Sequence, residues 1–212
     1  MSMNWMQRTG IGSVALLALL SSGCGDLVRQ GRSPVQLVIN KLEASSGATP
    51  GEFGGTLNSD VETLVERDVN GETVRVPTIF NDAAQVVMSL ILKDQGQAGI
   101  GATPSPTNAV TITRYRVSFR RTDGRNTPGV DVPFAFDSGV TFTVPPDGTV
   151  EAGFELVRHT AKQESPLAAL RRQRDMISTI TEITFFGRDL AGNDISVSGT
   201  IGVTFGDFGD PD

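Results

Sequence analysis

The sequence predicts an all-β fold, an antiparallel β-sandwich. From Val35 onward, short segments in which apolar and polar residues alternate are separated by clusters of Gly, Pro, Asn and Asp, which is typical of sandwiches and barrels. The single cysteine excludes intramolecular disulfides, so the domain must be stabilised by burial and hydrogen bonding. Eleven phenylalanines, the first of them Phe53, supply most of the aromatic material for a core.

The first predicted hairpin lies at the motif Val69-Asn70-Gly71-Glu72, between strands at 61–65 and 73–76. An Asn-Gly pair between two alternating segments is a strong signal for a two-residue hairpin turn. We therefore expect these strands to pair with each other.

The next apolar segment, 86–93, carries apolar residues at both parities. This pattern fits either a buried central strand or a helix that begins at Asn81 or Asp82, and its length and β-branched residues favour the strand. The following stretch, 96–108, is rich in Gly, Ser and Pro and is predicted to be a flexible loop, because proline disfavours both a β-ladder and a helix.

Three more strands are predicted in the middle of the chain, at 110–119, 140–144 and 150–158. In the first, Val110 and Ile112 share one phase of the alternation, whereas the later apolar residues share the other. An extra residue near Thr113 or Arg114 therefore predicts a β-bulge or a strand boundary.

A short helix and a hairpin are predicted in the last quarter of the chain. Ser165 and Pro166 precede good helix formers, so a short crossover helix is expected near 166–173. Strands at 180–186 and 195–205 follow, and in the second the apolar residues alternate with Ser and Thr, which predicts one buried face and one hydroxyl-bearing face.

This C-terminal hairpin also carries a resemblance. Its loop, Asp189-Leu190-Ala191-Gly192-Asn193, shows the Asp-x-x-Gly-Asn pattern, and residues 183–205 resemble the last two strands of bacterial Ig-like and fibronectin-type-III-like modules. The resemblance implies an Ig-like or fibronectin-type-III-like sandwich, with a binding or spacing role rather than a reaction.

The N-terminal segment has the three parts of an export signal: a polar region with Arg8, an apolar run at 11–20 and small residues at 21–23. Because a membrane-spanning helix needs about 20 apolar residues, the run is too short to be one. We therefore predict a cleaved signal peptide.

The segment Leu20-Ser21-Ser22-Gly23-Cys24 resembles the bacterial lipobox, in which the cysteine receives a diacylglyceryl group before cleavage. The family usually has Leu three places before the cysteine, where this chain has Ser21. The resemblance implies that Cys24 is the lipidation site, with palmitate-like acyl chains holding the exported protein on a bacterial membrane, and that Gly25 favours the outer membrane. The alternative is a secreted protein with a chance cysteine near its cleavage site.

The predicted organisation is a signal peptide at 1–23, a lipidated tether at 24–34, a single β-sandwich domain at 35–208 and an acidic tail at 209–212. The formal net charge of the whole chain is −6, which argues against a nucleic-acid partner because phosphate backbones attract basic surfaces.

Catalytic candidates are few. His159 is the only histidine and is expected on the exposed face of its strand. The chain has no Gly-x-Ser-x-Gly motif, and one histidine with a lipidated cysteine cannot form a zinc site. The sequence therefore predicts neither an enzyme nor a bound cofactor.

Calcium is the one metal for which the sequence offers weak candidates, because oxygen ligands on neighbouring loops can hold Ca²⁺. One set is the hairpin loop with Asp189, Asn193 and Asp194, and a second is the C-terminal group Asp207, Asp210 and Asp212. The alternative is that these residues only form turns.

A basic cluster with Arg120, Arg121 and Arg125 fits either an anionic lipid or glycan site or a solvated hairpin tip.

The leading functional hypothesis is a non-catalytic, lipid-anchored cell-envelope protein that binds or spaces other components, with a protein or glycan partner in the envelope. The alternative is a calcium-, glycan- or small-ligand-binding protein that uses the loops at 96–108, 123–131 and 189–194.

Overall fold

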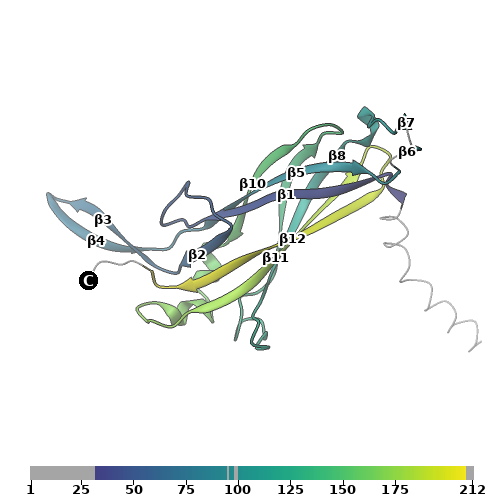
Figure 1. The fold of residues 1–212 in the computed structure, drawn as a ribbon. Coiled ribbons are helices and arrows are strands. Elements are labelled where there is room, and N and C mark those ends of the chain that lie inside the picture. The colour runs from purple at the N-terminus through teal and green to yellow at the C-terminus, as the bar shows by residue number, and fades with distance from the viewer. Residues whose placement is uncertain (1–31, 95, 98–99, 209–212) are drawn as a thin grey trace, which may run out of the picture.

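Two β-sheets pack face to face in the computed structural model, which describes residues 32–94, 96–97 and 100–208 (Figure 1). The smaller sheet has the order β1-β5-β10, and the larger has the order β2-β12-β11-β8-β9. The strands of the smaller sheet are β1 (Val35–Ser45), β5 (Asp82–Leu92) and β10 (Val150–Val157). Those of the larger sheet are β2 (Thr56–Asp60), β8 (Val110–Arg120), β9 (Phe136–Val144), β11 (Ile177–Asp189) and β12 (Asp194–Gly206). The prediction of an all-β sandwich is confirmed, whereas the finer Ig-like or fibronectin-type-III-like assignment stays a prediction.

The C-terminal hairpin shows how the alternation in the sequence produces the two faces of the larger sheet. Strands β11 and β12 pair antiparallel over their whole length. Their apolar residues, such as Ile183 and Val203, are buried, while hydroxyl pairs lie on the outer face, with 2.8 Å between the side-chain oxygens of Thr184 and Ser198. Cross-strand pairs of this kind each contribute a few tenths of a kcal/mol, roughly, to the pairing of the strands.

An aromatic cluster fills the space between the sheets. Phe185 is fully buried, and its ring packs edge-on against Phe154 with 5.2 Å between centroids. Tyr115 and Phe142 complete the contacts at 6.2 and 6.3 Å. The hydroxyl of Tyr115 donates to the main-chain oxygen of Glu155 at 3.0 Å, so the polar end of this ring is satisfied inside the core.

A β-bulge interrupts β8 where the change of phase predicts it. The register of β8 against both neighbouring strands shifts between Ile112 and Arg114. Opposite this point, Gly187 of β11 lies so close to β8 that a Cβ atom there would clash with the main-chain oxygen of Thr111. A glycine at this position therefore allows the two strands to approach at the bulge.

Strand β5 is the central strand of the smaller sheet, as the apolar pattern at 86–93 predicts. It pairs antiparallel with β1 on one side and with β10 on the other, and its residues Ala84, Val86 and Met88 are buried. A strand with neighbours on both sides and a core on one face satisfies its backbone without a helix.

A hairpin made of β3 (Thr63–Val69) and β4 (Glu72–Thr78) extends away from the sandwich (Figure 1). Its turn is formed by Asn70 and Gly71, with φ angles of 59° and 88°, as expected for the predicted two-residue turn. Among the residues that the structure describes, these two strands pair only with each other.

The structure differs from the predictions at three places. The crossover segment between β10 and β11 holds a four-residue α-helix, α3 (His159–Lys162), and then a 3-10 helix, η3 (Leu167–Leu170), rather than one helix near 166–173. Leu167 and Leu170 are both buried, and a spacing of three residues places them on one side of a 3-10 turn.

The second difference is that β2 runs parallel to β12, so the larger sheet is mixed rather than wholly antiparallel. The third is that the predicted loop at 96–108 contains two short paired strands, β6 (Gly96–Gln97) and β7 (Ile100–Gly101), and a 3-10 helix, η2 (Pro106–Asn108). Pro106 begins this helix, where its missing N–H costs no hydrogen bond.

The predicted signal peptide, Cys24 and most of the predicted tether lie outside the described residues, as does the acidic segment at 209–212. No helix in the described part of the chain is both long enough and apolar enough to cross a membrane.

Candidate functional site

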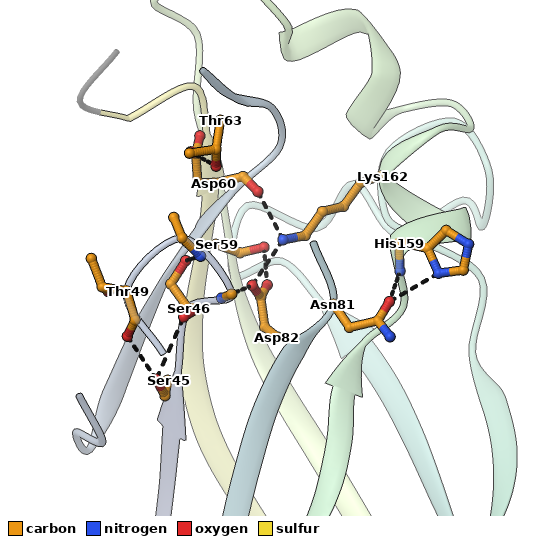
Figure 2. Close-up of polar contacts among 12 residues, drawn as sticks. Ser45, Ser46, Thr49, Ser59, Asp60, Thr63, Asn81, Asp82, His159 and Lys162 are labelled. Carbon is orange, nitrogen blue, oxygen red and sulfur yellow. Dashed lines mark hydrogen bonds and ion pairs between the residues drawn. The ribbon is translucent and has the colours of Figure 1, made fainter. Parts of the chain in front are cut away.

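A buried ion pair lies at one end of the sandwich (Figure 2). Lys162 comes from α3, and Asp82 is the first residue of β5. The lysine Nζ lies 2.8 Å from Oδ1 of the aspartate, and the two residues are 1% and 0% exposed. A lysine is almost never fully buried unless it is paired. The segments around Lys162 must therefore pack in a way that keeps its contact with Asp82.

Three further groups complete the polar cluster. The main-chain N–H of Gly47 donates to Oδ1 of Asp82 at 2.9 Å, and the hydroxyl of Ser59 donates to Oδ2 at 2.6 Å. Lys162 also donates to the main-chain oxygen of Asp60 at 2.7 Å. Burial raises the pKa of the Asp82 carboxyl, although the positive charge of Lys162 and the hydrogen bonds from Gly47 and Ser59 act in the opposite direction.

The strand register explains why these groups meet. Val157, the last residue of β10, is the partner of Asp82 in the sheet, so α3 begins beside the start of β5. The end of β2 brings Ser59 and Asp60 from the opposite sheet. Gly47 reaches the carboxylate from the loop after β1, where any Cβ would clash with the main chain of the segment before Asp82. The cluster therefore ties the two sheets and α3 together.

Two more hydrogen bonds hold α3 at its ends. The side-chain oxygen of Asn81 accepts from the main-chain N–H of His159 at 2.7 Å and lies 2.9 Å from Nδ1 of the same histidine. Arg171 donates from Nη2 to the main-chain oxygen of Lys162 at 3.0 Å. These bonds hold the main chain that carries the outward-facing side chains of this segment.

Those outward-facing residues form one wall of an open groove of about 220 Å³. This wall includes Ala161 and Glu164, and the opposite wall is formed by Phe134 and Phe136. The guanidinium of Arg158, which also lines the groove, lies 3.8 Å from the centre of the Phe136 ring, so this contact links the two walls. Phe134 is 58% exposed, so a large apolar side chain borders the groove in contact with solvent.

The loop that carries Phe134 is held by its own hydrogen bonds. Asn126 accepts from the main-chain N–H of Arg121 at 2.7 Å, and Asp131 accepts from that of Thr127 at 3.1 Å. Gly129, with a φ of 76°, lies directly under the Phe134 ring, where a Cβ would meet the ring carbons at 2.5 and 2.7 Å. The exposed phenylalanine is therefore presented by an ordered loop rather than by a loose one.

The groove and the buried ion pair lie at the end of the smaller sheet opposite to Val35. In the register of this sheet, Val35 pairs with Leu92 at one end of β5, whereas Asp82 begins the other end. The chain thus enters the sandwich at one end and presents the groove at the other.

The calcium candidates of the hairpin loop are brought together, but their oxygens already have partners. Asp189 accepts from the main-chain N–H of Asn193 at 2.8 Å and from its side-chain amide at 2.9 Å. Burial raises the pKa of the Asp189 carboxyl. The hydrogen bonds from Asn193, together with those from Ser33 and Ala191, have a larger effect in the opposite direction, so the pKa lies below its ordinary value. Asp194 pairs with Arg188, whose Nε lies 2.6 Å away. The contacts are those of a closed turn.

The C-terminal acidic group is only partly described. Asp207 accepts a hydrogen bond from the main-chain N–H of Arg172, while Asp210 and Asp212 lie outside the described residues. Within the described part of the chain, no group of three or more His, Cys, Asp or Glu residues could hold a metal ion.

Two arginines of the basic cluster pair with a single carboxylate. Nη2 of Arg121 lies 2.6 Å and Nη2 of Arg125 lies 2.9 Å from Oδ2 of Asp123, while Arg120 is exposed at the end of β8. These arginines therefore stabilise their own hairpin tip.

The pKa of Asp123 provides a test of this arrangement. Hydrogen bonds from the side chains of Arg121 and Arg125 lower it to about 2. The pKa in the folded protein lies below the value of about 3.9 in the unfolded chain. The ionised carboxylate therefore stabilises the fold above about pH 4, and this stabilisation is lost as the pH falls through about 2. A carboxyl-carbon NMR titration should show a midpoint near 2 that rises in Arg121→Gln protein. A midpoint at the unfolded value of about 3.9 would contradict the pairing of Asp123 with the two arginines.

His159 is exposed, as expected, but it begins α3 instead of continuing the strand. The pattern of the sequence does not single out Asp82, Lys162 or Ser59, which the structure brings together. Lys162 stands in a polar stretch typical of a protein surface, and Asp82 is 80 residues away from it along the chain. No local signal marks such a pair.

In comparisons with known proteins, no family model, no curated protein and no solved structure matches the chain.

Proposed function

We propose that this protein is a non-catalytic, lipid-anchored module of a bacterial cell envelope that binds another envelope protein through the groove beside Phe134. The anchoring part of the proposal rests on the export-signal pattern and on the lipobox-like segment that ends at Cys24. The binding part rests on one observation, the ordered loop that holds Phe134 exposed at the rim of the groove.

The chemistry of the groove favours a protein as the partner. Phe134 and Phe136 line the groove together with the polar residues Arg158 and Glu164. Val130 of the loop that carries Phe134 is also 65% exposed. An apolar centre with a polar rim is typical of protein interfaces. A nucleic acid would require a basic surface, whereas this groove carries Glu164 as well as Arg158.

The position of the groove fits a tethered protein. The tether precedes Val35, and the groove lies at the opposite end of the same sheet. A partner bound in the groove would therefore contact the end of the domain that is far from the tether.

Photo-crosslinking in intact cells tests the binding part. A benzophenone amino acid is introduced at Phe134 and, as a control, at Thr200, which is exposed on the outer face of β12. We expect a discrete protein adduct from position 134 and none from position 200. Equal adducts at both positions, or none at either, would exclude the groove as the binding site.

The anchoring part has its own test. Wild-type protein should fractionate with membranes and yield an N-terminal peptide that begins at an acylated Cys24, whereas Cys24→Ala protein should leave the membrane fraction, because two or three acyl chains are needed for stable anchoring. A Cys24→Ala protein that remains fully membrane-bound would disprove the anchor.

A further inference from the structure

We propose that the side chains of Lys162 and Asp82 become joined by an amide bond inside the folded protein. The two groups are an amine and a carboxyl, the reactants of an amide, and 2.8 Å separates Nζ from Oδ1 in a fully buried position. The inference is independent of the groove and of the membrane anchor.

The surroundings hold the two groups in a reactive arrangement. Lys162 is fixed by the main-chain oxygen of Asp60, while Asp82 is fixed by Gly47 and Ser59. Fixing two reactants in contact converts a bimolecular step into an intramolecular one, with a large gain in effective concentration. Because both side chains are buried, water is also excluded from the reacting atoms.

The same surroundings favour proton transfer from the amine to the carboxyl. Burial raises the pKa of the Asp82 carboxyl, so the carboxylate becomes a better acceptor for a proton from the lysine ammonium. Transfer of one proton from Nζ to Oδ1, which lies 2.8 Å away, produces a nucleophilic amine beside a carboxylic acid.

The bond-forming step is balanced without any co-reactant. The lone pair of Nζ attacks Cγ of Asp82 and gives a tetrahedral centre with its negative charge on Oδ2. The hydroxyl of Ser59, which already donates to Oδ2 at 2.6 Å, stabilises that charge. Oδ1, which is already protonated, takes a second proton directly from Nζ and leaves as water. One C–N bond forms, one C–O bond breaks and one water molecule is released.

The amide would close a covalent ring between β5 and α3. Asp82 and Lys162 are 80 residues apart in the sequence, so the link would restrict the unfolded chain strongly, as a disulfide does in a protein that has the cysteines to form one. This chain has a single cysteine and no such option.

Peptide mapping of the full-length protein purified from membranes tests the proposal. Trypsin cannot cleave after a lysine whose amine is acylated. We therefore expect a linked species made of residues 76–93 and 159–171, lighter than the two peptides together by one water molecule, with fragment ions that place the bond at Asp82 and Lys162.

Two variants sharpen the test. Lys162→Arg keeps the positive charge but should give no linked species, and Asp82→Asn should give none either, because an amide cannot take the proton from the lysine ammonium. Recovery of the free peptides 76–93 and 163–171 from the wild-type protein, with no linked species, would overturn the proposal and leave an ion pair.

Discussion

Replacing Lys162 with methionine should lower the free energy of unfolding by about 3–5 kcal/mol, the cost of removing one partner of a buried ion pair. Methionine fills a similar volume, but it leaves the carboxyl of Asp82 buried with hydrogen bonds from Gly47 and Ser59 and no positive charge beside it. Loss of an amide at the same position would change stability in the same direction. Equilibrium urea denaturation measures the change through the shift of its midpoint.

Two comparisons identify the cause of that loss. Lys41, whose side chain is 57% exposed in its pair with Glu43, provides the matched control, and Lys41→Met should change stability by at most about 1 kcal/mol. The double variant Lys162→Met/Asp82→Leu should be more stable than Lys162→Met alone, because it no longer buries an unpaired carboxyl. If the two lysine variants were equally stable, the buried pair would have no special role in the fold.

Replacing Phe185 with alanine should cost about 3–5 kcal/mol, the usual range for a buried phenylalanine. Phe185 is fully buried, and three other aromatic rings, from Tyr115, Phe142 and Phe154, pack against it from both sheets. Its removal leaves a cavity between the sheets and cancels the edge-on ring contacts. Thermal and urea unfolding, monitored by circular dichroism, measure the loss.

Phe53 is the control for this variant, because it is 37% exposed and lies outside the aromatic cluster. Phe53→Ala is expected to shift stability by about 0.5 kcal/mol or less. A Phe185→Ala protein that unfolds at the wild-type midpoint would show that the cluster is not the main support between the sheets.

Much of the fold follows from local patterns. The alternation in 180–186 and 195–205 predicts strands β11 and β12 because a period of two places every second side chain on one face. The Asn70-Gly71 pair predicts its hairpin because both residues tolerate positive φ. The change of phase near Thr113 predicts the bulge in β8 because one extra residue in a strand shifts the alternation of its side chains. These features depend on neighbours in the sequence.

Other features depend on residues far apart. The parallel pairing of β2 with β12 joins residues 56–60 to 202–206, and no local pattern specifies a partner at that distance. The 3-10 turn at Leu167–Leu170 forms where an α-helix is predicted, because packing of two buried leucines outweighs helix propensity. The groove likewise needs loop 133–136 and α3 to meet, and the order of strands in the sheets brings them together.

Short runs of residues are enough to predict the all-β class, the main hairpins, the bulge and a lipid anchor at Cys24. The buried contact of Lys162 with Asp82 and the exposed position of Phe134 beside the groove arise only when distant segments pack together. A lysine in a polar segment and an aspartate at the start of a strand are ordinary surface residues until folding removes water from both. Their energetic importance arises from desolvation and pairing, and these are properties of the folded chain.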